Sequence, residues 1–229
     1  MTAVVPPPRT LAGLLVPRLL TRTEDGERLH ALLWSPGPGW RMISSAVLGG
    51  GIGERTWVLN AQVSHGYRRT DPDRHLAVLA GEAGAHGPGV GLMTAADVSQ
   101  HARANDGGVS AVVTAGIEVR GWAASAAEGT IVPAKPGTIN IVAALPVALS
   151  DAALVNAVAT ATEAKVQALL DAGYDCSGTP TDAVCVATPA PRAGEEIHAF
   201  AGPRSVWGAR LARAVHNAVH DATSAADRV

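Results

Sequence analysis

A strand, a long helix and a second strand follow one another in the C-terminal half, and this order strongly constrains the fold. The first segment, "TINIV" (138–142), is rich in β-branched residues that favour strands. Ser150 and Asp151 then provide an N-cap and an acidic first turn for a helix over 151–172. A second strand is predicted for "TDAVCVAT" (181–188). The helix makes this strand pair a crossover, and we expect the two strands to be neighbours in one sheet.

The remaining elements are clustered rather than alternating. Strands are predicted at 28–34, 40–48, 56–63, 89–96 and 108–119, and further helices at 71–83 and 204–223. This clustering favours an α+β fold, with helices packed on a β-sheet, over a doubly wound sheet. We expect a single domain over 1–229, in which 1–39 is a peripheral N-terminal segment and 40–223 forms the core.

Composition excludes several classes of function. Of the 229 residues, 47% are hydrophobic and 17% are charged, which is enough for a sizeable core. A net charge of -2 without a Lys/Arg run gives no electrostatic case for a nucleic-acid or membrane partner. The N-terminus lacks the pattern of a signal peptide, and no apolar run approaches the roughly 20 residues of a membrane span. We therefore expect a cytoplasmic protein in which Cys176 and Cys185 are reduced thiols.

Neither a metal nor a nucleotide cofactor is expected. The eight histidines are scattered without the spacing of a zinc site. "LGGGIGE" (48–54) follows a strand, but another strand comes next, so no helix N-terminus is available for a pyrophosphate. Close approach of the backbone to a ligand is the better explanation of Gly49, Gly50 and Gly51.

Small polar residues recur at the ends of the predicted strands, beside glycines. They are Ser44, Ser45, Thr94, Thr114, Thr138 and Thr181. Their shared position suggests a pocket lined by hydroxyl groups and backbone N–H groups. Asn140 lies two residues after Thr138, so both side chains face the same side of their strand.

Lys165 lies on the predicted apolar face of the helix over 151–172. That face consists of Leu154, Val155, Val158, Thr162, Val166 and Leu169. One interpretation is that Lys165 extends its ammonium group to water. The other is that it is held beneath the sheet, beside a carboxylate or a hydroxyl, where burial alters its chemistry.

Several segments resemble the adenosylcobinamide amidohydrolase family of cobalamin salvage. In chain order they are "WRMISSAVLGGG", "WVLNAQV", "GLMTAADV", "VVTAGI", "PGTINIV", "ATATEAKVQALLDAG" and "SGTPTDAVCVA". The resemblance implies hydrolysis of the amide that joins aminopropanol to a corrin side chain. Adenosylcobinamide would then give adenosylcobyric acid and 1-amino-2-propanol.

A bulky corrinoid with amides at its rim suits a pocket of glycines, amides and hydroxyls. The candidate substrate-binding residues are Ser44, Ser45, Gly49, Gly50, Gly51, Asn60, Thr94, Thr114, Asn140 and Thr181. A non-catalytic corrinoid-binding or trafficking protein could use the same pocket, and this alternative stays open, as does a homo-oligomeric state.

A fainter similarity, in layout only, is to the self-processing D-aminopeptidases, and it implies a four-layer αββα sandwich. In those proteins a Gly-Ser bond opens a strand and the serine is the nucleophile, which places Thr138 in that role here. The candidate bases are Lys165, Asp182 and the amine that cleavage after Gly137 would release. Water activated by Asp182 or Glu163 is the alternative to a Thr138 nucleophile.

Overall fold

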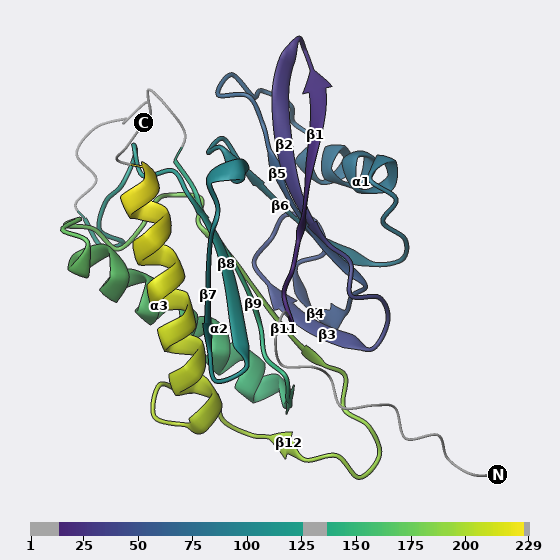
Figure 1. The fold of residues 1–229 in the computed structure, drawn as a ribbon, viewed down its shortest axis with the longest axis vertical. Helices are drawn as coiled ribbons and strands as arrows, with labels where there is room; N and C mark the ends of the chain where they lie inside the picture. The colour runs from purple at the N-terminus through teal and green to yellow at the C-terminus, as the bar shows by residue number, and fades with distance from the viewer. Residues whose placement is uncertain (1–13, 126–136, 227–229) are drawn as a thin grey trace.

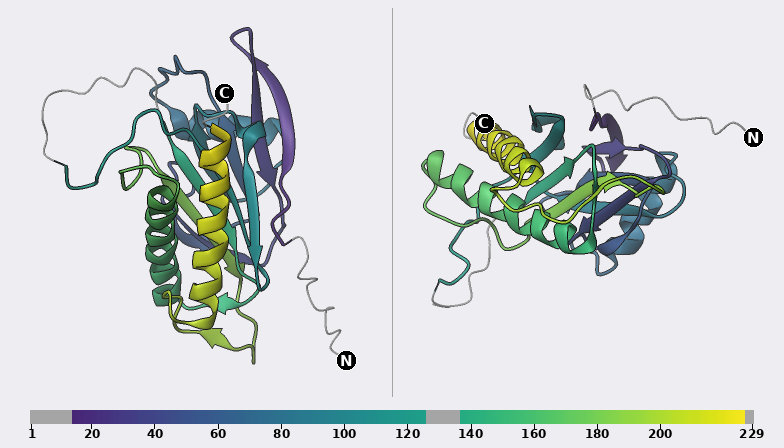
Figure 2. Two further views of the ribbon diagram at one scale, coloured as in Figure 1. Left: turned by 60° about the vertical axis from the view of Figure 1, so that its left-hand side comes forward. Right: turned by 90° about the horizontal axis from the view of Figure 1, so that it is seen from below.

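Two β-sheets face each other, and helices cover the outer face of each sheet (Figures 1 and 2). This computed structural model describes residues 14–125 and 137–226. The four-stranded sheet has the order β1 (Arg18–Glu24), β2 (Glu27–Trp34), β5 (Trp57–Gln62), β6 (Gly89–Thr94). The six-stranded sheet has the order β4 (Gly51–Glu54), β3 (Trp40–Ser44), β11 (Ala183–Pro189), β9 (Ile139–Ala144), β8 (Val109–Ala115), β7 (Ala102–Asp106).

The helices divide between the two outer layers. The described residues form α1 (Pro72–Glu82), α2 (Asp151–Asp171), α3 (Val206–Ala226) and the short 3₁₀ helix η1 (Val98–Gln100). Helix α1 packs on β5 and β6, whereas α2 and α3 pack on each other and on the six-stranded sheet. A small parallel pair, β10 (Ala148–Leu149) and β12 (Ile197–His198), forms a separate two-stranded sheet. None of the described helices is long and apolar enough to span a bilayer.

Strands β9 and β11 are parallel neighbours, and α2 connects them, so the predicted crossover is confirmed. In the register of this pair, Asn140 lies opposite Ala183 and Ile141 opposite Val184. Both strands therefore begin at the same end of the sheet. That end is the upper one in Figure 1, close to the end of α3.

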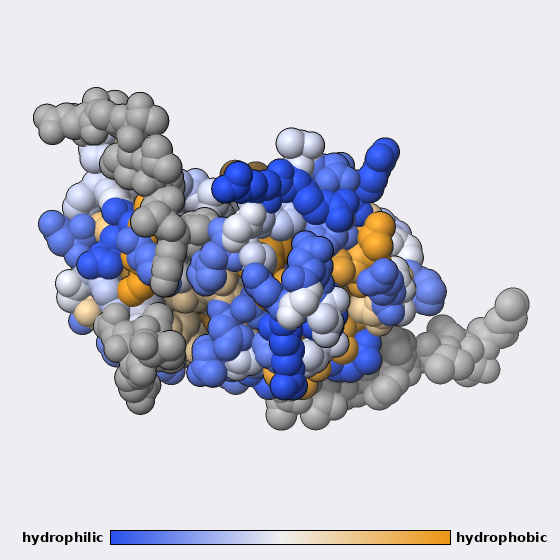
Figure 3. Space-filling view, turned by 90° about the horizontal axis from the view of Figure 1, so that it is seen from above, coloured by the Kyte–Doolittle hydropathy of each residue, from blue (hydrophilic) through white to orange (hydrophobic). Residues whose placement is uncertain are grey.

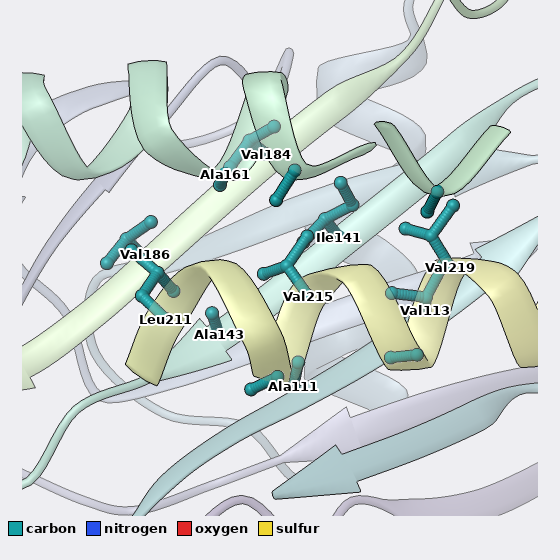
Figure 4. Close-up of a cluster of buried hydrophobic side chains, with 14 of the residues drawn as sticks. Ala111, Val113, Ile141, Ala143, Ala161, Val184, Val186, Leu211, Val215 and Val219 are labelled. Atoms are coloured by element: carbon teal, nitrogen blue, oxygen red, sulfur yellow. The ribbon is translucent and has the colours of Figure 1, made fainter. Parts of the chain in front are cut away.

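Three apolar cores separate the four layers. The largest lies between the six-stranded sheet and α2 and α3, where Ile141 and Val186 meet Val215 and Val219 (Figure 4). A second core, which includes Leu92 and Val142, fills the space between the two sheets. The third lies beneath α1. The order helix, sheet, sheet, helix is the αββα sandwich that the layout similarity implied, within the predicted α+β class.

The buried face of α2 differs from the predicted one. Val155 is 58% exposed and Thr162 is also exposed, whereas the helix buries a stripe of small residues. The buried small residues are Ala153, Ala157, Ala161, Ala164 and Ala168. Alanine lets α2 approach both α3 and the sheet closely, so contact with two neighbours selected this face over the one with larger side chains.

The expectation that residues 1–39 are peripheral is wrong for 18–34. This segment supplies β1 and β2, and β2 is a central strand of the four-stranded sheet. Leu32 and Leu33 are almost completely buried on opposite faces of β2, in two different cores. Two-sided burial makes β2 part of the folded core.

Both cysteines are free and buried, and they lie in different cores. Burial raises the pKa of the Cys185 thiol to about 12 and also raises the pKa of Cys176. Since the thiolate is the reactive form, we expect neither cysteine to react with iodoacetamide at pH 8 in the native protein. Mass spectrometry should find both alkylated only after unfolding. Native alkylation at the unfolded rate would contradict this burial.

Candidate active site

Two threonines meet where β9 and β11 begin. The Thr138 and Thr181 hydroxyl oxygens are 2.6 Å apart, and the Thr181 hydroxyl also lies 3.1 Å from the Gly137 carbonyl oxygen, to which it donates. When Thr181 donates to that carbonyl, its oxygen accepts the proton of Thr138. The parallel pairing therefore brings together two of the hydroxyl residues selected from the sequence.

Asp182 joins this pair to the rest of the site. One carboxylate oxygen accepts from the backbone N–H of Ile139 at 2.9 Å and from the Thr179 hydroxyl at 2.5 Å. The other accepts from the Thr179 N–H at 3.1 Å and from the Lys165 ammonium at 2.5 Å. Asp182 thus fixes the start of β9 to the turn before β11.

Lys165 reaches Asp182 from α2 and is only 7% exposed. Of the two interpretations of this lysine, the structure confirms burial beside a carboxylate. A buried ion pair compensates for its desolvation only when hydrogen bonds satisfy its remaining oxygens, as Thr179 and Ile139 do here.

A pocket of about 490 Å³ opens beside this cluster, between the ends of the two sheets. The six-stranded side contributes Ser45, Thr138, Thr181 and Asp182, and the facing side contributes Ser64, Tyr67, Leu92 and Thr94. Figure 3 views the molecule from above, and polar residues on this face surround smaller apolar patches. The walls combine apolar surface with a few converging polar groups, as ligand pockets do.

A second pocket, of about 570 Å³, lies on the other side of the ion pair. Lys165 lines this second pocket, together with Arg120, Trp122 and Gly178, whereas Asp182 lines the first. The Lys165–Asp182 pair therefore lies between the two pockets.

The glycines of "LGGGIGE" do not line the pocket beside Thr138. Gly49 has a φ of 69° and lies so close to the Gly89 carbonyl that a side chain would overlap it. Gly50 is similarly close to the carbonyl of Ala46, and Gly51 begins the edge strand β4. Gly49 and Gly50 therefore allow close packing of the chain on its own backbone, whereas at Gly51 only the positive φ of 78° favours glycine.

Ser44 has a local structural role. Its hydroxyl donates to the Val184 carbonyl at 2.9 Å and accepts from the Ala46 N–H at 3.0 Å. The side chain is buried and holds the end of β3 against β11. The neighbouring Ser45, rather than Ser44, faces the pocket.

Asn60, Thr114 and Asn140 form a buried network between the sheets. The Asn60 amide donates to the Thr114 hydroxyl at 2.9 Å, and the Asn140 amide donates to the Asn60 side-chain oxygen at 2.8 Å. Asn140 also donates to the Met93 carbonyl at 3.0 Å. These polar residues link the two sheets across the core below the pocket.

No group of three or more His, Cys, Asp or Glu side chains within 14–125 and 137–226 is arranged to hold a metal ion. Asp182 and Glu163 were the two candidates for activating a water molecule. Asp182 lines the pocket beside Thr138, whereas Glu163 is exposed on α2 and lines neither pocket. The geometry thus assembles Thr138, Thr181, Asp182 and Lys165 and leaves Glu163 outside.

The sequence matches the family model described as CbiZ, adenosylcobinamide amidohydrolase, over residues 17–229. The chain belongs to the adenosylcobinamide amidohydrolase family. A protein of that name from Methanosarcina mazei is 33% identical over 178 residues, which cover 75% of this chain and 84% of the relative. Another of that name, from Halobacterium salinarum, is 39% identical over 134 residues, which are 56% of each chain.

The match to the adenosylcobinamide amidohydrolase family includes β1 and β2. The resemblance of the quoted segments began only at Trp40. Among solved structures, the PH0078 protein from Pyrococcus horikoshii OT3 superposes with a TM-score of 0.47 at 11% identity. That superposition covers 91% of this chain and 82% of the other.

Gly178 tests the packing of the ion pair. Its φ is 147°, and a methyl group there would overlap both the Asp182 carboxylate and the Lys165 ammonium. Because backbone strain and separation of the pair add together, we expect Gly178→Ala to lower the free energy of unfolding by about 2 kcal/mol or more. Urea denaturation measures this change.

Gly81→Ala is the matched control, since a side chain at this helical glycine of α1 would meet no atom within 4 Å. The control should be neutral or stabilising by about 0.5–1 kcal/mol. A Gly178→Ala protein as stable as the wild type would contradict the tight packing around the ion pair.

Proposed function

We propose that this protein hydrolyses adenosylcobinamide to adenosylcobyric acid and 1-amino-2-propanol in corrinoid salvage. The observation that carries the proposal is the family match over residues 17–229. The site supports it, because hydrolysis of an amide needs a nucleophile, a route for protons and stabilisation of the oxyanion. Hydroxyl groups and the Asp182 carboxylate line the pocket, and the Lys165 ammonium is paired with that carboxylate.

The pocket size suggests which part of the substrate enters. A corrin macrocycle with its adenosyl group is larger than a space of about 490 Å³. We therefore propose that only the aminopropanol-bearing side chain enters beside Thr138, while the macrocycle lies at the mouth of the pocket. The mixed apolar and hydroxyl lining suits a neutral amide side chain.

In the proposed reaction, the Thr138 hydroxyl attacks the amide carbonyl carbon. The bond to nitrogen then breaks, 1-amino-2-propanol leaves with a proton, and water hydrolyses the resulting ester. Thr181 is a neutral hydroxyl, so its contact with Thr138 orients the nucleophile rather than activating it as a base.

The base remains open among the candidates. A nucleophilic hydroxyl needs a base within hydrogen-bond reach, but in the described part of the chain the partner of the Thr138 hydroxyl is Thr181. Lys165 and Asp182 do not contact the Thr138 hydroxyl in the described residues. The Asp182 carboxylate instead accepts from the Ile139 N–H and the Thr179 hydroxyl. The Thr138 amine becomes available only if the bond after Gly137 is cleaved.

The non-catalytic alternative, a corrinoid-binding or trafficking protein, is not favoured. A binding protein has no need for hydroxyl groups beside a buried lysine and carboxylate, whereas the family to which the chain belongs is named for a hydrolytic reaction. We further propose that the enzyme acts in the cytoplasm, without a nucleic-acid or membrane partner; its oligomeric state is left open.

We expect the purified protein to release 1-amino-2-propanol from adenosylcobinamide without added metal, nucleotide or other cofactor. Chromatography with mass detection measures both products, and an incubation with EDTA is the control. Activity that vanishes with the chelator and returns with zinc would refute the metal-free part of the proposal. Unchanged adenosylcobinamide after prolonged incubation would refute the hydrolytic function.

Thr138→Ala should lower kcat by about 10³-fold or more while corrinoid affinity changes by less than about threefold, because only transition-state stabilisation is lost. Thr138→Ser keeps the hydroxyl and should keep part of the activity. Thr23→Ala, which removes an exposed hydroxyl on β1, is the control. Near-normal turnover of Thr138→Ala would leave water activated by Asp182 as the mechanism.

Intact mass spectrometry of the same proteins distinguishes the bases. If the Thr138 amine serves as the base, the active enzyme consists of two chains divided after Gly137, and Thr138→Ala stays whole. An active wild-type enzyme with an unbroken 23.3 kDa chain would exclude this base.

A further inference from the structure

The pocket that Thr138 lines has a second wall, which comes from the four-stranded sheet and the loop after β5. Tyr67, in the loop between β5 and α1, lines it. Behind Tyr67, its hydroxyl oxygen lies 3.1 Å from Nδ1 of His75, and Nε2 of His75 lies 3.1 Å from Oε1 of Glu24. A phenol, an imidazole and a carboxylate thus form a hydrogen-bonded relay that leads from the pocket to the end of β1.

Arg22 and the packing of the two rings hold this relay in place. Arg22 donates from Nε and Nη2 to Oε2 of Glu24 at 3.1 and 2.8 Å, which leaves Oε1 for His75. The same guanidinium donates to the carbonyl of Gln62 at 2.5 Å and is thereby fixed to the end of β5. The Tyr67 and His75 rings are nearly parallel, with 9° between their planes.

The contacts define the positions of the protons. A carboxylate only accepts, so the His75 proton lies on Nε2 and points to Glu24. Nδ1 is then an acceptor, and the Tyr67 hydroxyl donates to it. The lone pairs of the phenol oxygen are left for a donor in the pocket. A hydroxyl, a base and a group that orients the base stand in the same order where hydrolases remove the proton of a hydroxyl.

We propose that Tyr67 is the proton-transfer residue of the hydrolytic reaction, with His75 and Glu24 as its positioning residues. The phenol oxygen accepts the proton of the attacking hydroxyl while the phenol's own proton moves to Nδ1 of His75. In the reverse shift, His75 returns its proton to the phenol oxygen as Tyr67 donates one to the amide nitrogen. That nitrogen then leaves as an amine, and the relay regains its starting state.

The relay supplies a base that the sequence did not suggest, and it rests on the proposed hydrolytic function. Burial raises the pKa of Tyr67, so the phenol stays neutral and moves one proton only as it gains another. His75 is 4% exposed, and desolvation lowers its pKa below the ordinary value of 6.5 despite the opposing effect of Glu24. The imidazole is therefore neutral and able to accept at pH 7.

The pH dependence follows from the groups around His75. Those that act on it or contact it are Arg22 and Glu24 from β1, and Tyr67, Arg69 and Asp71 from the loop. A protonated His75 has no free lone pair for the Tyr67 proton. We therefore expect kcat/KM to be level near neutral pH and to fall as the pH drops below 6.5, through the lowered pKa of His75.

Tyr67→Phe tests the proposal, because it keeps the ring and removes only the hydroxyl. We expect kcat to fall by about 10²–10⁴-fold with little change in KM. His75→Gln should abolish the acidic limb of the pH profile, and the double variant should be no slower than Tyr67→Phe alone. Tyr174→Phe, at the other tyrosine of the chain, is the control and should retain wild-type kcat.

Each failure has its own signature. A wild-type protein that releases no 1-amino-2-propanol contradicts the proposed function, whereas an active wild type with an equally active Tyr67→Phe variant contradicts the relay.

Nitrogen-15 NMR of His75 tests the relay without substrate. We expect the Nε2–H tautomer at pH 7 in the wild type and a shifted His75 pKa in Tyr67→Phe. An Nδ1–H tautomer would overturn the relay irrespective of the activity.

Discussion

The parallel pairing of β9 with β11 is the constraint on which the site depends. It places the residues before each strand side by side, so that Thr138 meets Thr181 without either residue being near the other in the chain. Asp182 stabilises this junction, because its carboxylate binds the first N–H of β9 and the turn before β11. Helix α2, which makes the crossover, then supplies Lys165 to the same carboxylate. One topological unit therefore provides the proposed nucleophile, its neighbour and the ion pair.

The second sheet turns this junction into a pocket. Apolar packing between the sheets holds them apart by the width of a core, and their ends enclose the space beside Thr138. The Asn60–Asn140–Thr114 network replaces part of this apolar contact. Its hydrogen bonds can form in only one register, because a slip by one residue would turn Asn140 toward the opposite core. The network thus stabilises the alignment of the two walls, and with it the pocket that Thr138 and Tyr67 both line.

Much of the candidate site could be predicted from the sequence, but only where its residues lie within the crossover unit. Thr138, Lys165, Thr181 and Asp182 carry local signals: polar residues at strand ends, or a charge on an apolar helix face. Glu24, Tyr67 and His75 carry none, because a strand, a loop and a helix contribute one residue each. The glycines at 49–51 do not line the pocket beside Thr138. Close approach to a ligand and close approach to the chain's own backbone both require the absence of a side chain, so composition does not distinguish them.

Local sequence is sufficient for the elements that are buried on both faces or capped by their own residues. The Ser150 cap of α2, whose hydroxyl accepts from the Ala153 N–H, and the β-branched strands β9 and β11 are examples. The strands β1, β4 and β7 were missed because they are edge strands, whose partly exposed, polar residues lack the hydrophobic signal of a strand. Only the tertiary structure decided which face of α2 is buried, which wall faces Thr138 and which histidine meets a carboxylate. Each of these depends on contacts between residues distant in the chain, and hydrophobic periodicity reports only how a segment is buried, not against what.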